Sequence, residues 1–319
     1  MLNQGQRVVL PLKPTDMNRS LADYVARHAP IFRGHDVRGY LAERRFHVNG
    51  EPAPAETILQ SGDKLELMRP PWHEPEVPRD FPIVFEDADV LVVDKPAGIP
   101  ITPTGPFLTH SLLHLLRNEF ANPDLAPIHR LDLETSGLIA FAKRVEARGW
   151  FQSQFQRQTV EKRYEALVFG RFPKDLHLVD IALDRDTLIH SKFVPHPQGK
   201  PARTEILDRH HWGTYSFVSL RPLSGRTHQI RAHLAAVGHP IVGDKKYGSN
   251  PGLFLKWLET KDTKLYLNEW KLPAQALHNR GLILQDRKGC RLVLRSERDV
   301  AHSWQRGIAS IDGDIQISG

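Results

Sequence analysis

The sequence PIHRLDLETSGLIAFAK, from Pro127 to Lys143, decides most of what can be inferred about this chain. Residues 135–137, TSG, are turn formers, and the apolar run LIAFA at residues 138–142 predicts a short buried strand. Asp132 lies just before that turn and two residues after Arg130. A carboxylate fixed at the edge of an apolar strand can act as a nucleophile, a base or a metal ligand. An isolated Asp can equally bond its own backbone in a turn, so the rest of the chain must decide.

Composition places the chain among ordinary globular proteins with a basic bias. It has 319 residues, of which 40% are hydrophobic and 25% charged, enough for one large domain and a small one. A single cysteine, Cys290, excludes an internal disulfide and favours a reducing cytoplasm. The N-terminal residues lack the layout of a signal peptide, and no apolar run reaches membrane-spanning length. We therefore expect a soluble, cytoplasmic monomer, and the net charge of +6 suits a polyanionic partner.

The domain organisation follows from a proline-rich break. Residues 1–68 contain two short helical patterns and an Asn49-Gly50 hairpin signal, which predict a small α+β module. Residues 69–80, RPPWHEPEVPRD, contain too many prolines for a helix or a central strand and are expected to form a linker. Residues 81–300 form the predicted large domain, and residues 301–319 a polar, peripheral tail.

The large domain is predicted to be an α+β protein with a predominantly antiparallel mixed sheet. Several strand patterns, including EKRYEALVFGRF from Glu161 to Phe172, are interrupted by few helices, too irregularly placed for repeated βαβ units. One expected helix, LTHSLLHLLRNEF, holds His110 and His114 four residues apart, but Ser111 stands where a zinc protease carries Glu. Another is expected to begin near Arg226, in GRTHQIRAHLAAVG.

Several chemistries are excluded because their motifs are missing. The sequence contains no G-x-x-x-x-G-K-[ST], G-x-G-x-x-G or G-x-S-x-G pattern, the signals for P-loop nucleotide hydrolysis, dinucleotide binding and α/β-hydrolase activity. A cysteine-based zinc site is impossible with one cysteine. The residues therefore predict either an enzyme without cofactor or metal or a binding protein.

The motif around Asp132 resembles the signature of the RluA-type family of RNA pseudouridine synthases. Three further blocks follow the family order: LVVDKPAGIP, VEKRYEALVFG and LRPLSGRTHQIRAHLAAVGHPIVGDKKYG. The resemblance covers roughly Phe81 to Leu294 and implies the pseudouridine synthase fold. The N-terminal module is similar to the alpha-L RNA-binding domain, although its first half departs from that pattern. A second departure is ITPT at residues 101–104, where relatives often have a histidine-proline pair.

The resemblance implies an isomerase that converts uridine in structured RNA to pseudouridine after flipping the base. It makes Asp132 the essential carboxylate, Tyr164 the tyrosine that stacks on the base and is a candidate proton acceptor, and Arg226 the arginine that pairs with Asp132. Arg130 is the candidate wedge that fills the space of the flipped base. Lys162, His129 and Lys95 complete the expected RNA-binding set. Covalent attack and elimination are both compatible with these residues.

Two other classes of function compete with this one. A non-catalytic RNA-binding or ribosome-assembly factor could use the same fold. A glycoside hydrolase would need a second positioned acid, for which Glu134 and Glu161 are the candidates. For the synthase, the N-terminal module favours ribosomal RNA as the target, and transfer RNA stays open because residues 69–80 also resemble tRNA-modifying relatives.

Overall fold

The computed structural model describes residues 2–28, 36–189, 191–248 and 251–312. The chain divides into two compact units, residues 1–75 and 76–319, and the division falls inside the proline-rich segment. Among the described residues no helix combines the length and the apolar character needed to cross a bilayer.

The first unit is a small α+β module in which a four-stranded sheet has the order β1-β6-β3-β4. Two further strands, β2 and β5, pair with each other. Its elements are β1 (Gln6–Leu10), a 3₁₀ turn (Pro14–Asp16), β2 (Arg19–Ser20), α1 (Leu21–Arg27), α2 (Val37–Ala42), β3 (Phe46–Val48), β4 (Glu51–Pro52), β5 (Ile58–Leu59) and β6 (Leu65–Arg69).

Local sequence explains much of this unit. The Ser20 hydroxyl caps α1 by accepting a hydrogen bond from the Asp23 backbone N–H. Asn49 and Gly50 join β3 to β4 with φ of 55° and 93°, the left-handed pair that a tight hairpin requires. The strand β1 was not predicted, because it pairs with β6 at the far end of the unit and its own pattern is short.

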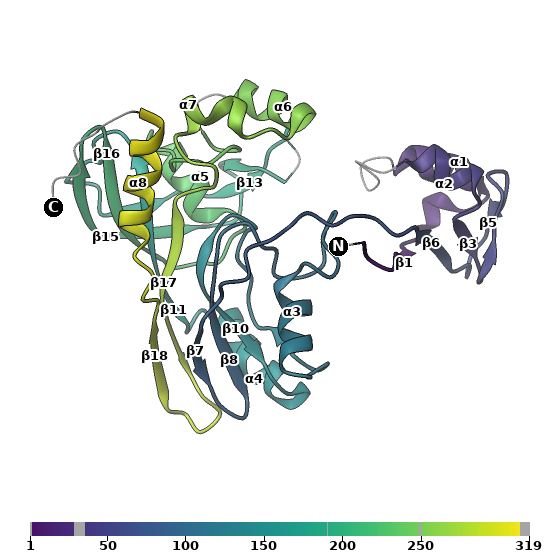
Figure 1. Ribbon diagram of the computed structural model, residues 1–319, viewed down its shortest axis with the longest axis horizontal. Helices are drawn as coiled ribbons and strands as arrows, with labels where there is room; N and C mark the ends of the chain where they lie inside the picture. The colour runs from purple at the N-terminus through teal and green to yellow at the C-terminus, as the bar shows by residue number, and fades with distance from the viewer. Residues whose placement is uncertain (1, 29–35, 190, 249–250, 313–319) are drawn as a thin grey trace. The chain divides into compact units, whose positions relative to one another are not determined.

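The second unit is built on one large sheet with helices around it (Figure 1). Its elements are β7 (Ile83–Glu86), β8 (Val90–Lys95), α3 (Leu112–Glu119), β9 (Ala126–Pro127), β10 (Ser136–Ala142), α4 (Val145–Gln156), β11 (Glu161–Phe169), β12 (Leu178–Asp180), β13 (Leu183–Arg185), β14 (Phe193–Pro195), β15 (Arg203–Trp212), β16 (Tyr215–Pro222), α5 (Gln229–Ala236), α6 (Pro251–Thr260), a 3₁₀ turn (Lys264–Tyr266), α7 (Leu267–Trp270), β17 (Leu277–Gln285), β18 (Arg291–Arg295) and α8 (Val300–Asp312).

The main sheet has the order β12-β15-β16-β11-β17-β10-β8-β7, with β18 paired to β17 and β9 paired to β10. Within the described chain its strand pairs are antiparallel except for β10 and β17, which run parallel at Ser136–His278 and Gly137–Asn279. This confirms the predicted α+β class with a predominantly antiparallel mixed sheet.

Strands β8 and β10 are buried on both faces, which explains their continuous apolar sequences. Side chains alternate along a strand, so Ile139 and Phe141 enter one core while Leu138 and Ala140 enter the other. Helix α3 supplies apolar side chains to the first core and α4 to the second. Figure 1 shows both helices beside these strands. The two cores hold β10 in place, and with it the loop of Asp132 that leads into it.

The C-terminal segment differs from the predicted polar tail. Residues 300–312 form α8, whose Ile308 is fully buried and whose Trp304 stacks on Phe217 with 6.4 Å between ring centroids. The apolar side chains of this helix face the β16 side of the sheet, so its mixed composition reflects amphipathicity. Residues 313–319 of the predicted tail lie outside the described residues.

Candidate active site

Asp132 lies in a turn at the entrance to β10. The Thr135 backbone N–H donates to the Asp132 carbonyl at 3.2 Å, and the Gln275 side-chain amide donates to the Thr135 hydroxyl. Gly137 follows with φ of 107°, and a Cβ there would lie 2.4 Å from the backbone of Asn279. Only glycine allows this approach between β10 and β17. The turn therefore fixes the backbone of Asp132 while its carboxylate, with a side chain 22% exposed, remains open to solvent.

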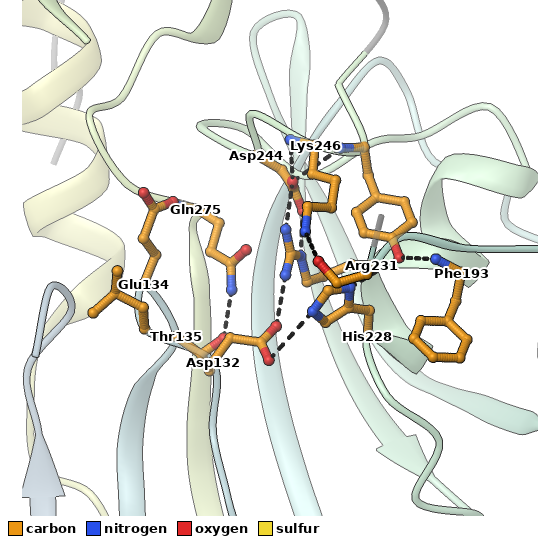
Figure 2. A network of polar contacts seen from close by, with 12 residues as sticks. Asp132, Glu134, Thr135, Phe193, His228, Arg231, Asp244, Lys246 and Gln275 are labelled. Atoms are coloured by element: carbon orange, nitrogen blue, oxygen red, sulfur yellow. Dashed lines mark hydrogen bonds and ion pairs between the residues drawn. The ribbon is translucent and has the colours of Figure 1, made fainter. Parts of the chain in front are cut away.

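Arg231 pairs with the Asp132 carboxylate. Its Nη1 donates to Asp132 Oδ2 at 2.6 Å (Figure 2). Burial alone would raise the pKa of Asp132, but the charge of Arg231 and its hydrogen bond to the carboxylate outweigh burial and hold this pKa below its usual value. The carboxylate is therefore ionised and aimed, as a nucleophile or base requires.

A second carboxylate, Asp244, holds the other edge of the same guanidinium. Arg231 Nε and Nη2 donate to its two oxygens at 2.7 and 2.9 Å, and the Tyr247 ring lies 4.9 Å from the guanidinium carbon. Asp244 also accepts the backbone N–H groups of Lys246 and Tyr247, both at 3.0 Å. Burial opposes ionisation of Asp244, but Arg231 outweighs it and lowers the pKa of this carboxyl. Asp132, Arg231 and Asp244 thus form one continuous polar chain.

His228 occupies the remaining side of Asp132. Its Nε2 lies 3.7 Å from Asp132 Oδ1, and its Nδ1 lies 3.0 Å from the Tyr247 hydroxyl. That hydroxyl also accepts the Phe193 N–H at 2.7 Å, so Tyr247 links the His228 ring to the backbone of β14. Burial, and then Arg231, lower the pKa of His228 to about 4. The ring is therefore neutral near pH 7.

The prediction that Arg226 pairs with Asp132 is wrong. Arg226 Nε donates to the Pro201 carbonyl at 3.0 Å, away from the carboxylate. The helix α5 begins at Gln229, so Arg226 lies in the loop before it and Arg231 lies in the first turn. Sequence reasoning missed Arg231, although a signal was present. An arginine within the mostly apolar QIRAHLAA must be buried, and a buried cation needs a partner.

Tyr164 lies on β11, 9% exposed, and lines a cavity of about 520 Å³ together with Asp132, Lys162 and Arg226. Burial, and then the charge of Asp132, raise the pKa of this tyrosine. The phenol is therefore neutral at physiological pH, a form suited to packing against a base. Lys162 also lines this cavity, and burial lowers its pKa.

The remaining predicted RNA contacts divide into two groups. Arg130 is exposed and lines the cavity. His129 accepts the Ala140 N–H at 3.1 Å and stacks on Phe155, so its ring braces the loop against β10 and α4. Burial, and then the charge of Lys162, lower the pKa of His129 to about 3, which keeps it neutral.

Lys95 is not an RNA contact, which corrects the prediction. It is fully buried, and its ammonium donates to the carbonyls of Pro96, Ile99 and Leu133 at 2.9, 2.9 and 3.0 Å. Burial lowers its pKa to about 7. Because all three N–H groups are used by backbone oxygens, Lys95 ties the loop after β8 to the loop of Asp132.

The acids required by a glycoside hydrolase are engaged elsewhere. Glu134 forms an ion pair with Lys245, and Glu161 lies 3.4 Å from Arg291. Over the described ranges, no group of three His, Cys, Asp or Glu side chains is arranged to hold a metal ion. The arrangement around Asp132 supports chemistry by a single ionised carboxylate beside a pocket with an aromatic wall.

Comparison with known proteins identifies the family. The family model described as RNA pseudouridylate synthase matches residues 89–236. RNA pseudouridine synthase 7 of Arabidopsis thaliana is 35% identical over 66% of this chain, which spans 55% of that protein. Ribosomal large subunit pseudouridine synthase D of Yersinia pestis is 31% identical, over 74% of this chain and 75% of that protein.

A solved structure, Human RNA Pseudouridylate Synthase Domain Containing 1, superposes with a TM-score of 0.56 at 27% identity, covering 71% of this chain and 86% of that one. The fold, the ordered motifs and the relatives agree: the chain belongs to the RluA-type family of RNA pseudouridine synthases.

Proposed function

We propose that this enzyme isomerises uridine in structured RNA to pseudouridine with Asp132 as the catalytic carboxylate. The observation that carries the proposal is the ion pair of Asp132 with Arg231 at the mouth of the cavity lined by Tyr164. An ionised carboxylate can attack or electrostatically stabilise the ribose anomeric carbon as the glycosidic bond breaks, or remove a ribose proton. Both pathways use the same geometry.

The other residues take supporting roles in this proposal. Tyr164 stacks on the flipped uracil, and as the candidate acceptor of the proton at the new carbon linkage it would have to act as the phenolate. Stacking is the role that its neutral phenol performs without ionising. Flipping costs about a few kcal/mol, and Arg130, exposed beside the cavity, is the candidate to fill the vacated space. Lys162 is the candidate contact to a phosphate.

Ribosomal RNA is the proposed target. The relative from Yersinia pestis is named as a large-subunit ribosomal enzyme, and residues 1–68 resemble a module found in ribosomal modifiers. Transfer RNA is the alternative. Binding of RNA by the N-terminal unit, the monomeric state and the cytoplasmic location stay predictions.

Substitution of the catalytic carboxylate tests the proposal. Pseudouridines are mapped in total RNA from cells lacking this protein after incubation with wild type, Asp132→Asn or Asp124→Asn. We expect new pseudouridine with the wild type and with Asp124→Asn, whose side chain is exposed in the loop before β9. Asp132→Asn should bind the same RNA and form none, because an amide is not a nucleophile at this carbon. Full activity in Asp132→Asn, or none in the wild type, would contradict the proposal.

A further inference from the structure

A second cavity, of about 630 Å³, adjoins the one that contains Tyr164. Asp132, Arg130, His228 and Arg231 contribute to the walls of both cavities. The volume lies within the range of about 300 to 1,000 Å³ that is usual for small-molecule sites. A strand of RNA that places one base against Tyr164 therefore has a second recess within reach of the neighbouring nucleotide.

One side of this second cavity is aromatic and apolar. Helix α6 supplies Phe254, Trp257 and Leu258, and the rings of Phe254 and Trp257 stack with centroids 5.9 Å apart and planes at 26°. Another part of the lining is residues 100–104, which include the ITPT segment that departs from the family pattern. Helix α6 and residues 100–104, neither of which belongs to the proposed catalytic set, therefore both line the second cavity.

Cations without a carboxylate partner line the same cavity. Arg231 is shared between Asp132 and Asp244, and Glu134 is paired with Lys245. Across the residues that the structure describes, neither Arg130 nor Lys246 forms an ion pair. Lys246, beside Arg231 in Figure 2, has its ammonium 2.8 Å from the Ser191 hydroxyl and 5.6 Å from the centre of the Phe254 ring.

Aromatic faces combined with cationic side chains outside ion pairs are the usual composition of sites for single-stranded nucleic acid. We propose that the second cavity binds the nucleotide adjacent to the target uridine in the same RNA strand. Its base packs against Trp257 and Phe254, and its phosphate contacts Lys246 and Arg130. The inference rests on the proposed function, because the target uridine must occupy the cavity of Tyr164.

Kinetics on a synthetic stem-loop that carries a uridine mapped as above test this assignment. Base–aromatic stacking corresponds to about 5-fold to 150-fold in affinity, so Trp257→Ala should raise KM within that range and change kcat little. Trp257→Phe keeps an aromatic ring and should stay near wild type. The matched control is Trp150→Ala, since Trp150 is 41% exposed on α4 and lines neither cavity. Thermal unfolding of each variant verifies that it is folded.

Abasic substitutions in the RNA identify the bound nucleotide. Removing the base on one side of the target uridine should raise KM for the wild type. The same abasic RNA should not raise KM further in Trp257→Ala, because the abasic substitution and the loss of Trp257 remove the same contact. Lys246→Ala should lower the salt dependence of RNA binding by about one phosphate contact, whereas the exposed Lys288→Ala should not.

The outcomes separate the two proposals. A wild type that forms no pseudouridine contradicts the proposed function. If the wild type is active but Trp257→Ala leaves KM unchanged, only the second-nucleotide site is contradicted. The same holds if, at both neighbouring positions, the rise in KM caused by the abasic substitution adds fully to the rise caused by Trp257→Ala.

Discussion

The guanidinium of Arg231 binds two carboxylates, Asp132 and Asp244, and its two edges have different roles. The Nε edge is held by Asp244, which is buried and fixed by backbone N–H groups, while Nη1 reaches Asp132, which is open to the cavity. Burial would lower the pKa of Arg231, but the two carboxylates raise it, so the cation is permanent. Asp244 therefore acts as a positioning residue that aims Arg231 at Asp132.

Removing the charge of Asp244 tests this role. In Asp244→Asn the buried Arg231 loses half of its compensation, so we expect stability to fall by about 3–5 kcal/mol. Because a misplacement of about 1 Å can cost about 100-fold in rate, kcat should fall by that order while KM changes little. The measurements are urea unfolding and single-site pseudouridine formation.

Two controls keep that prediction specific. Asp244→Glu restores the charge and should recover part of kcat if aiming is the role. Asp175→Asn alters an exposed carboxylate outside both cavities and should change neither quantity. A kcat equal to wild type in Asp244→Asn would exclude the positioning role.

At the scale of elements, the catalytic turn depends on the close approach of β10 to β17. The parallel pairing at Gly137 and Asn279 leaves no room for a side chain, as a Cβ at Gly137 would lie 2.4 Å from the Asn279 backbone. The position at which α5 begins matters equally, because a start at Gln229 places Arg231, and not Arg226, next to the Asp132 carboxylate.

Substitutions of two glycines separate the cost of a left-handed backbone conformation from the cost of a steric overlap with a neighbouring strand. Gly137 and Gly289 have φ of 107° and 84°, but a Cβ at Gly289 meets nothing within 4 Å. Gly289→Ala should cost about 1 kcal/mol from the left-handed backbone alone. Gly137→Ala should cost about 1–3 kcal/mol more, because β10 or β17 must shift to relieve the overlap. Equal losses for the two variants in urea unfolding would contradict this account.

At the scale of the whole molecule, a buried polar chain joins distant parts of the second unit. His278 on β17 lies 2.8 Å from the hydroxyls of Ser136 and Ser296, and the Ser296 hydroxyl donates to Asp94 on β8. Since Ser296 donates to Asp94, His278 donates from Nε2 to Ser296 and accepts at Nδ1 from Ser136. Burial, and then Arg280, lower the pKa of His278 to about 3.

The neutral state of His278 predicts how stability depends on pH. The unfolded chain, with a histidine pKa of about 6.5, binds a proton that the folded chain excludes down to about pH 3. Stability should therefore fall as pH decreases from about 6.5 towards 3, by up to about 1.4 kcal/mol per pH unit from this residue. His278→Gln should reduce that slope, measured by urea unfolding between pH 6 and 4. His302→Gln, exposed on α8, should leave the slope unchanged; an unaltered slope in both variants would contradict the prediction.

Short-range sequence patterns were enough to predict the local features and the family. The Ser20 cap, the Asn49-Gly50 hairpin and the apolar run of β10 are written in short-range patterns, and the motif around Asp132 indicated the enzyme class. Amphipathicity predicted α3, but α8 was missed because its apolar residues lie among polar ones. The domain boundaries of the prediction were drawn from composition, which marks the proline-rich break but not the pairing of β1 with β6.

Tertiary structure decided which polar side chains meet. Asp132 and Arg231 are 99 residues apart, and their 2.6 Å contact depends on the start of α5 and on the buried Asp244. Arg226 and Lys95 are basic residues like Arg231, yet neither contacts Asp132. Arg226 donates to the carbonyl of Pro201, and the Lys95 ammonium donates to three backbone carbonyls. A sequence motif supplies the charge of a residue and its neighbours along the chain. Burial and partners come from segments distant in sequence, and these determine whether a cation contacts the substrate, aims the catalyst or braces the fold.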